Sequence, residues 1–236
     1  PRDWSSDVCS SDLSELVVTA RAGTGLAELE QELAARGQML AFEPPHFGPS
    51  ATVGGMVAAG LAGPRRLAQG VATGSVRDSV LGARLLNGRG EVLTFGGQVV
   101  KNVAGYDVSR LMCGAHGTLG VVLDIALRLS PVPECTLSLA RECEPVEAMQ
   151  IMQSLRARPL PVSGAAWDAG VLRAPWFEQA PQFAGKFGLA RYFAEGGVRG
   201  GVVFVEADMA PADRRREAEL FAEWGAASGM PWASTP

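Results

Sequence analysis

The sequence has few of the residues that build metal sites. It contains only two histidines, His46 and His116, and four cysteines scattered along 236 residues. No pair of cysteines has the C-x-x-C spacing of a zinc site, and four are too few for the disulfide framework of a small secreted domain. We therefore expect free thiols and no metal site. Any demanding chemistry would depend on an organic cofactor.

Long apolar runs and excess positive charge are also missing. No run approaches about 18 apolar residues, and the first residues lack the basic start and apolar centre of a signal peptide. The net charge of −4 and the pI near 5.3 do not fit a broad nucleic-acid-binding surface. We expect a cytoplasmic protein whose partners are small molecules or other proteins. Hydrophobic residues make up 47% of the chain, enough for a sizeable core.

The beginning of the chain differs from everything after it. The stretch "DWSSDVCSSDL", Asp3 to Leu13, is polar, repeats Ser-Ser-Asp, and has neither helical nor strand periodicity. A common short-read sequencing adapter, read in one frame, encodes the same residues. We interpret residues 1–13 as an artefact that replaces the natural start of a domain.

The pattern of a folded domain begins at Ser14. "SELVVTAR" predicts a strand, and Thr24 is a suitable N-cap for a helix that ends at Gly37. A long Gly-, Pro- and Ala-rich stretch with one short helix follows. "DSVLGARLLNGRGEVLTFGG" predicts a hairpin. The predicted helix presents one apolar face, formed by Leu26, Leu29 and Leu33.

Two more elements precede a predicted domain boundary. Asp107 can cap a short helix, and residues 121–129 alternate as a strand that ends at Pro131. Beyond Pro133 we expect a strand at 137–142, a helix opened by Pro145, two more strands, and a last helix within "DRRREAELFAEWGAA". This order predicts a split βαβ unit that lacks its last strand. The helix after Pro145 is expected to bury Val146, Met149, Met152 and Leu155.

Two glycine-rich clusters are the strongest binding signals. They are "GPSATVGG", Gly48 to Gly55, and "GAHGTLG", Gly114 to Gly120. Glycine lets main-chain N–H groups approach a diphosphate or a flavin closely, although the same residues also form simple tight turns. The second cluster has G-x-x-G-x-x-G spacing. This differs from the dinucleotide fingerprint, and no phosphate-binding P-loop motif occurs in the chain.

The order of these segments resembles a known flavoprotein family. "EPPHFGPSATVGGMVAAGLAGPRR", "VRDSVLGARLLNGRGEVLTFGG" and "VKNVAGYDVSRLMCGAHGTLGVVLDIALRL" together resemble the FAD-binding domain of the vanillyl-alcohol-oxidase type, also called PCMH-type. Within that superfamily, "GGQVVKNVAGYDVSRLMCGAHGTLGV" and "FEPPHFGP" are similar to the FAD-binding E subunits of bacterial glycolate oxidase. The resemblance covers Ser14 to Pro133.

The resemblance implies an α+β fold in two domains. Residues 14–131 would form the second half of a PCMH-type FAD-binding domain, a mainly antiparallel sheet with flanking helices. The N-terminal half-domain, with its own glycine-rich diphosphate loop, would be missing. Residues 132–236 would form a partial ferredoxin-like α+β cap region. After about residue 175 the match is poor, which leaves open a frame error, a splice with another read, or a divergent cap.

The resemblance also implies the FAD contacts, chiefly through main-chain groups. One group would line the diphosphate and the ribityl side, a second would continue that wall, and a third would close on the adenosine or diphosphate end. No catalytic residue and no metal ligand is identified. The three groups are, in order, Pro49, Ala51, Thr52, Val53, Gly54 and Gly55; then Ala59, Gly60 and Gly63; then Gly117, Thr118, Gly120 and Val121.

Several side chains near these segments have two interpretations. Arg65 and Arg66 either add charge near the phosphates or form a solvated surface pair. His46 either faces the flavin or is a hydrogen-bonded structural residue. Lys101 and Asn102 would neighbour the cofactor.

For three other residues the simpler role is favoured. We expect Tyr106 to pack and to hydrogen-bond through its hydroxyl, and Cys113 to be buried and inert. We expect no chemistry from His116.

The implied activity is the oxidation of glycolate to glyoxylate, in which the flavin takes the hydride. The histidine-rich metal motif of the related D subunit does not occur here. The chain would therefore bind FAD and relay electrons in a complex with the D subunit and an iron–sulfur F subunit, in the cytoplasm or peripheral to the inner membrane. The alternatives are an FAD-linked oxidase of another 2-hydroxy acid or alcohol, and a non-flavin assembly module. The chain alone is expected to bind FAD weakly or not at all, because half the cradle is missing.

Overall fold

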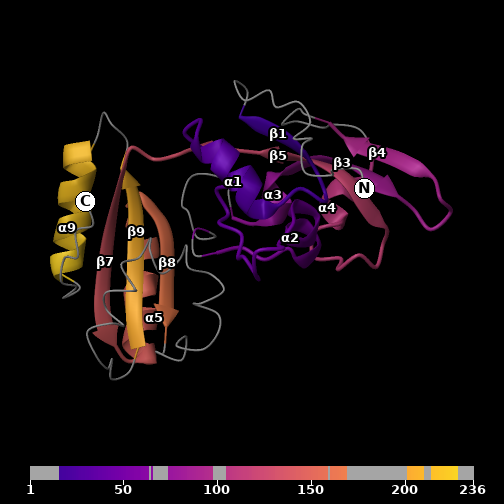
Figure 1. Cartoon of the computed structure of the whole chain (residues 1–236). Coiled ribbons are helices and arrows are strands. Elements are labelled where there is room, and N and C mark those ends of the chain that lie inside the picture. The colour runs from indigo at the N-terminus through magenta and orange to yellow at the C-terminus, as the bar shows by residue number, and fades with distance from the viewer. Residues whose placement is uncertain are drawn as a thin grey trace. The chain divides into compact units, whose positions relative to one another are not determined.

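The computed structural model separates into two units, each an antiparallel sheet with helices (Figure 1). This confirms the predicted α+β class. The first unit comprises Pro1–Gly63 and Thr73–Val132, and the second comprises Pro64–Ala72 and Pro133–Pro236. The structure describes residues 16–63, 65, 74–97, 105–158, 160–168, 201–209 and 214–227.

The first unit is built on a four-stranded sheet with the strand order β1-β5-β3-β4, in which all neighbours are antiparallel. The predicted strand at 121–129 becomes β5, which pairs with β1 on one side and β3 on the other. A two-residue β2 pairs with β6 outside this sheet. The bounds are β1 Val17–Arg21, β2 Gln38–Met39, β3 Val80–Leu86, β4 Val92–Gly96, β5 Val121–Arg128 and β6 Ser130–Pro131.

The predicted hairpin joins β3 to β4. Asn87 organises its turn, because its side-chain oxygen accepts hydrogen bonds from the N–H groups of Arg89 and Glu91 at 2.9 and 3.0 Å. Gly90 takes a φ of 79°, which glycine adopts without the steric cost of a Cβ. The turn chemistry read from the sequence is therefore confirmed.

Among the described residues, four helices belong to the first unit. α1 buries Leu26, Leu29 and Leu33, as predicted, but its N-cap is Gly25 rather than Thr24. The Thr24 main-chain carbonyl instead accepts the N–H of Val53, which ties the start of α1 to the start of α2. The helices are α1 Leu26–Ala34, α2 Val53–Ala59, α3 Val76–Ser79 and α4 Val108–Leu111.

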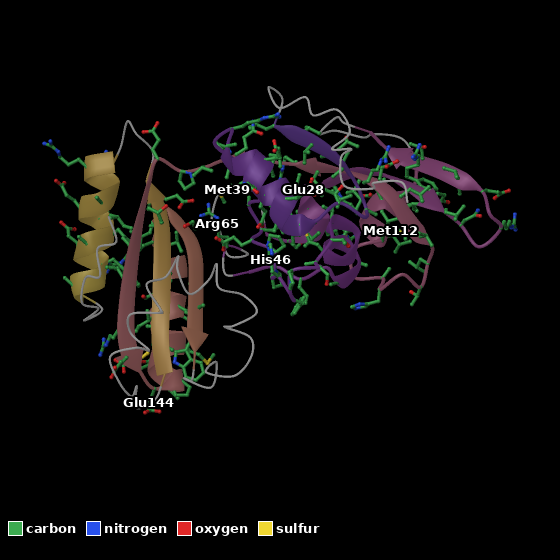
Figure 2. All side chains as sticks on the ribbon, viewed as in Figure 1. Glu28, Met39, His46, Arg65, Met112 and Glu144 are labelled. Atoms are coloured by element: carbon green, nitrogen blue, oxygen red, sulfur yellow. The ribbon has the colours of Figure 1, made fainter. Side chains whose placement is uncertain are left out.

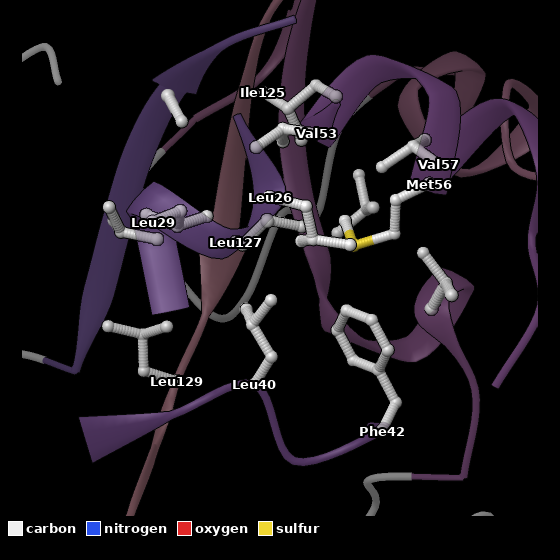
Figure 3. Packing of buried hydrophobic residues seen from close by; sticks show 14 of the residues in the cluster. Leu26, Leu29, Leu40, Phe42, Val53, Met56, Val57, Ile125, Leu127 and Leu129 are labelled. Carbon is white, nitrogen blue, oxygen red and sulfur yellow. The ribbon is translucent and has the colours of Figure 1, made fainter. Parts of the chain in front are cut away.

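The main core of the first unit lies between the sheet and the helices α1 and α2 (Figure 3). Side chains of β5, such as Ile125 and Leu127, meet Leu26 from α1 and Val53 from α2, and all four are at most 1% exposed. Phe42, in the loop that leads towards α2, is fully buried against the same cluster. This core fixes the position of α2 and of the glycine-rich residues in it.

The second unit is a three-stranded sheet of order β7-β9-β8. β7 and β8 are both antiparallel to β9 and therefore parallel to each other, so β7, α5 and β8 form the predicted split βαβ unit around β9. Leu139, Phe221 and Trp224 are buried in its core. The bounds are β7 Cys135–Cys143, α5 Pro145–Arg156, β8 Val162–Asp168, β9 Gly201–Met209 and α9 Arg214–Ala227.

The predicted buried face of α5 is wrong at its first two positions. Val146 is 70% exposed and Met149 is 62% exposed, whereas Ala148, Ile151 and Leu155 are buried. The prediction repeated a three-residue spacing, which drifts by about 60° at each step on a helix of 3.6 residues per turn. The observed spacing of three and four residues stays on one stripe.

Candidate functional site

The first glycine cluster forms the start of α2. Thr52 is the N-cap, and its hydroxyl oxygen accepts the Gly55 N–H at 3.1 Å. The Val53 N–H donates to the Thr24 carbonyl at 3.0 Å, and the Gly54 N–H donates to the Ala22 carbonyl at 2.8 Å. The first amides of α2 are thus hydrogen-bonded within the first unit. A ligand at this end would meet the surface of the helix and not a set of open N–H groups.

Gly54 and Gly55, at the start of α2, are glycines for different physical reasons. A Cβ on Gly54 would lie 2.7 Å from the Ala22 Cβ and 2.9 Å from the Ala22 oxygen, so glycine is required for close packing after β1. Gly55 is exposed, and a Cβ there would meet only the Thr52 hydroxyl within 4 Å, at 3.2 Å. Of the two, Gly55 is the residue whose bare main chain a cofactor can reach. Pro49 and Ala51 lie in the loop before the helix, where Pro49 is exposed and Ala51 half-buried.

The second glycine cluster docks onto the other end of α2. The Gly114 N–H donates to the Val57 carbonyl at 3.1 Å, and the His116 N–H donates to the Ala58 carbonyl at 3.0 Å. These bonds satisfy carbonyls that a helix C-terminus otherwise leaves open. Gly60 closes the helix in the left-handed conformation, with φ of 66°. The structure therefore joins the two clusters that the sequence placed about 60 residues apart.

The loop 114–120 keeps open donors. Its left-handed residues are Gly114, His116 and Gly117, with φ of 76°, 49° and 75°. Thr118 folds back, because both its hydroxyl and its N–H donate to the Ala115 carbonyl, at 2.7 and 3.0 Å. Within the described part of the chain, the amides of Gly117 and Leu119 have no hydrogen-bond acceptor. Consecutive left-handed and turn residues of this kind present N–H groups to an anion.

The remaining predicted contacts lie in the last turn of α2, in the loop after it, and at the start of β5. Ala59 is in the last turn of α2, and the Gly63 N–H is shared by the carbonyls of Phe42 and Glu43, at 2.9 Å each. Val121 begins β5 and is 58% exposed, and the neighbouring Gly120 lies against the Leu86 carbonyl. The clusters thus occupy opposite ends of one seven-residue helix, about 10 Å long.

His46 is paired within the first unit. Its Nε2 lies 2.9 Å from the Glu30 carboxylate on α1, and its side chain is only 16% exposed (Figure 2). Of the two interpretations of His46, the geometry supports the structural, hydrogen-bonded one.

Arg65 follows neither interpretation from the sequence. Its side chain is 9% exposed and forms an ion pair with Asp208 of β9, so it is neither solvated nor open to a phosphate. A guanidinium that is removed from water needs such a bidentate partner. Arg66 lies outside the described residues.

The structure contradicts one prediction for the segment before α4. Tyr106 was expected to pack and to hydrogen-bond, but it is 93% exposed. It stands one residue before the N-cap of α4. Asp107 is the N-cap as predicted, since its side chain accepts the Arg110 N–H at 3.3 Å. Lys101 and Asn102 lie outside the described residues.

Cys113 and Cys143 are free cysteines. Burial raises the pKa of the Cys113 thiol to about 11, and burial also raises the pKa of the Cys143 thiol. Both are therefore neutral at physiological pH. Cys113 is half-buried rather than fully buried, and its inertness stays a prediction. In the described residues no cluster of His, Cys, Asp and Glu could hold a metal ion. None of the described helices combines the length and apolar character needed to cross a bilayer.

Comparisons with known proteins bear on the fold and on the cofactor. Residues 5–96 match the family model described as "FAD binding domain". A solved structure of alkyldihydroxyacetonephosphate synthase superposes with a TM-score of 0.69 at 18% identity, over 98% of this chain and 42% of that chain, which supports the fold alone. The fold therefore resembles that of this structure, and the first part of the chain matches an FAD-binding domain. The family match begins inside residues 1–13, whose interpretation as adapter sequence stays a prediction.

Comparison with individual proteins identifies more specific relatives. The chain is 52% identical over 160 residues to "Glycolate oxidase subunit GlcE" of Escherichia coli, over 68% of this chain and 45% of that protein. It is 34% identical over 122 residues to a mitochondrial D-lactate dehydrogenase of Arabidopsis thaliana, covering 52% and 20% of the two chains. It is 33% identical over 138 residues to subunit GlcD of Bacillus subtilis, covering 58% and 28%.

These matches confirm the resemblance to the E subunits of glycolate oxidase and support FAD as the cofactor. The relatives carry the names of oxidoreductases or their subunits. The chain spans less than half the length of these relatives.

The residues present fit part of an FAD site. The exposed main chain of Gly55 and Gly117 lets a planar or phosphate group approach without meeting a Cβ, and the open amides of the loop 114–120 suit phosphate oxygens. Sequence reasoning missed Glu43, a buried residue in the left-handed region with φ of 48° whose carbonyl holds Gly63. No local signal marks such a residue, because the conformation is imposed by the loop around it.

Proposed function

We propose that this chain is the FAD-binding subunit of a glycolate oxidase-type complex that oxidises glycolate to glyoxylate. The observation that carries the proposal is the docking of the loop 114–120 onto the end of α2. It brings both predicted cofactor segments to one helix, in a chain that is 52% identical to a GlcE subunit. Bound FAD would supply the hydride acceptor that the side chains lack.

In this proposal the chain's own residues hold and orient the cofactor. The amides of Gly117 and Leu119 donate to phosphate oxygens, and the hydroxyl of Thr118 keeps the turn in shape by bonding to Ala115. Gly55 would offer a surface without a side chain at the start of α2, and Gly60 lets the loop 114–120 approach the end of the helix. The remaining predicted contacts line the same path: Pro49, Ala51, Thr52, Val53, Gly54, Ala59, Gly63, Gly120 and Val121.

The proposed partners are a D subunit and an iron–sulfur F subunit. The described residues hold no cluster for a metal-assisted activation of the hydroxy acid, so a partner would activate the substrate and this chain would relay electrons. We place the complex in the cytoplasm, with contact to the inner membrane only through its other subunits. The second unit would be part of the cap domain.

A chimera tests the proposal. The matched segment of this chain replaces the corresponding segment of Escherichia coli GlcE, and the product is purified with its partner subunits. We expect a flavin absorption spectrum that bleaches when glycolate is added under anaerobic conditions. A chimera that assembles with its partners but contains no flavin, beside a flavin-loaded parent, would refute the proposal.

A second candidate is an FAD-linked oxidase of another 2-hydroxy acid or alcohol. It is favoured by the 34% identity to a protein named D-lactate dehydrogenase. The same flavin-loaded chimera separates the two: bleaching by D-lactate but not by glycolate supports this candidate.

A third candidate is an assembly module that binds no flavin. It is favoured by the start of α2, where the amides of Val53, Gly54 and Gly55 are already hydrogen-bonded within the first unit. A folded chimera that supports activity of the complex without carrying any flavin itself would support it.

A further inference from the structure

A side-chain contact holds the middle of the loop that leads to α2. The loop runs from Phe42, which is fully buried, to Thr52, the N-cap of the helix. Between these ends the His46 Nε2 lies 2.9 Å from a carboxylate oxygen of Glu30 on α1. The carboxylate accepts this hydrogen bond, so Nε2 is the ring nitrogen that carries the hydrogen. All of these residues belong to the described part of the first unit.

The second half of the same loop forms a tight turn. The Ala51 N–H donates to the Gly48 carbonyl at 3.2 Å, and Gly48 takes a φ of 122°, which favours glycine. Pro49, a predicted cofactor contact like Ala51, lies inside the turn and is exposed. The Ala51 carbonyl accepts the Leu26 N–H at 2.8 Å, so the far end of the turn is bound to the start of α1. We call residues 48–51 the Gly48 turn.

Glu30 is a firm attachment point because the core holds α1 in place. Leu26, four residues before Glu30, and Leu33, three residues after it, are at most 2% exposed. Glu30 therefore lies at the border of the buried face of α1. The side chain of His46 is 16% exposed and that of Glu30 is 35% exposed, so water competes only in part for their hydrogen bond.

The contact at His46 limits the Gly48 turn from the end opposite to Ala51. Only Phe47 separates His46 from Gly48, and one residue spans at most about 3.6 Å of chain. Without the contact, the free part of the loop would extend back towards Pro44, which is buried. A longer free span has more conformations, so the turn would adopt any one binding shape less often.

The same contact is expected to contribute little to the folding of the first unit. Partly exposed pairs of this kind add little to stability, because water compensates for much of their loss. The buried side chains of α1 and of Phe42 do not depend on it. Loss of the contact should therefore change the order of the loop more than the free energy of unfolding.

We propose that His46 is a positioning residue that, through Glu30, holds the Gly48 turn in the shape that FAD contacts. This inference rests on the proposed function. It gives the hydrogen-bonded His46 a role in cofactor binding that needs no contact with the flavin.

Amide exchange with water, measured by NMR on the full chain without ligand, gives the first test. The variants are His46→Ala, His46→Gln, Glu30→Ala, and His46→Ala combined with Glu30→Ala. A glutamine can place an N–H donor where the His46 Nε2 lies. The matched control is Glu32→Ala on the same helix, because Glu32 is exposed and has no hydrogen bond or ion pair within the described residues.

We expect the Ala51 amide to exchange about fivefold faster in His46→Ala and Glu30→Ala, as for the loss of one hydrogen bond of ordinary net strength. Exchange should stay near the normal rate in His46→Gln and Glu32→Ala. Adding His46→Ala to Glu30→Ala should have no further effect, because His46 acts through Glu30. Unchanged exchange at Ala51 in His46→Ala, or a further increase in the double variant, would overturn the inference.

Flavin retention by the chimera with Escherichia coli GlcE gives the second test. The His46 variants are made in the flavin-loaded chimera, purified with its partner subunits, and FAD release is followed after dilution. We expect His46→Ala to release FAD about fivefold faster and His46→Gln to match the unsubstituted chimera, at equal melting temperatures. A merely structural role would lower the melting temperature and leave FAD release unchanged.

The two tests separate the failure of this inference from the failure of the proposed function. Normal FAD release in His46→Ala, in a chimera that carries flavin, would overturn the inference and leave the proposed function standing. A chimera that assembles without flavin would refute the proposed function and with it the role of His46 in FAD binding. The exchange test then still decides whether His46 holds the Gly48 turn.

Discussion

The main chains of Gly60 and Gly114 are in direct contact. A Cβ on Gly60 would lie 2.8 Å from the Gly114 nitrogen and 3.0 Å from its Cα. This contact, with the two hydrogen bonds from the loop 114–120 to the carbonyls of Val57 and Ala58, docks the second glycine cluster onto the C-terminal end of α2, whose N-terminal end carries the first cluster. The candidate site depends on it.

Replacing Gly60 should weaken the docking of the loop 114–120 onto the C-terminal end of α2. Gly60→Ala combines a left-handed φ of 66° with a collision against the Gly114 main chain, so we expect a loss of about 2–4 kcal/mol in the free energy of unfolding. Gly114→Ala is the matched control. Its φ of 76° is also left-handed, but its Cβ would meet nothing within 4 Å, so the loss should be about 1 kcal/mol. Urea denaturation measures both, and equal losses would contradict the proposed contact.

The adjacent glycines of α2 should respond differently to alanine. Gly54→Ala should destabilise the first unit by about 2 kcal/mol, because the new Cβ meets the Ala22 carbonyl and the helix cannot move away from the sheet. Gly55→Ala should change stability by less than about 1 kcal/mol, since gained helix propensity offsets a disturbed Thr52 cap. It should nevertheless weaken FAD binding. Thermal melts and FAD titration separate the two effects, and a Gly55→Ala chain with normal FAD affinity would count against Gly55 as a contact.

The Cys113 thiol should make stability depend on alkaline pH. Its pKa is about 11 in the folded chain and 9.0 when unperturbed, so the unfolded chain loses the proton first. The stabilising contribution is complete below pH 9 and falls between pH 9 and 11. Urea midpoints measured across this range should drop less in Cys113→Ala than in the unsubstituted chain. Identical pH profiles would show that the thiol is not desolvated.

The exposed stripe of α5 should tolerate polar residues. Val146→Lys and Met149→Lys should each shift stability by no more than about 0.5–1 kcal/mol, because both side chains are more than 60% exposed. Ile151→Ala should cost about 2–4 kcal/mol, since Ile151 is buried in the core of the second unit. If Val146→Lys and Met149→Lys instead cost more stability than Ile151→Ala, the buried face of α5 would be the one predicted from the sequence. The melting temperature of the second unit measures the difference.

The sequence predicted elements well where the signal is local. The hairpin at Asn87–Gly90, the Asp107 cap, the apolar face of α1 and the strand order that makes a split βαβ unit all follow from turn residues and periodicity, and all are confirmed. The α5 face was wrong because two stripes of similar hydrophobicity run along that helix. Only the packing against β8 and β9 decides between them.

The sequence indicates which segments form the candidate site, but not how they meet in the fold. The glycine clusters could be found from the sequence, and their contact through Gly60 and Gly114 could not, because it depends on where two distant segments cross. The Arg65–Asp208 ion pair joins residues 143 positions apart. The local sequence gave no sign of it, because Arg65 and Arg66 together are typical of a solvated surface pair. The prediction that Tyr106 packs against the protein was wrong for a related reason, because the exposure of a side chain at a turn is set by tertiary structure.

The most direct measurement is an FAD titration of the isotopically labelled chain, followed by amide chemical shifts and carried to millimolar FAD so that weak binding is detected. The account predicts that amides of Gly55, Gly60 and Gly63 and amides of Gly117 and Leu119 shift together along one binding curve, while those of the hairpin turn at Arg89 do not. Shifts confined to one glycine cluster would contradict a cofactor site that spans both ends of α2.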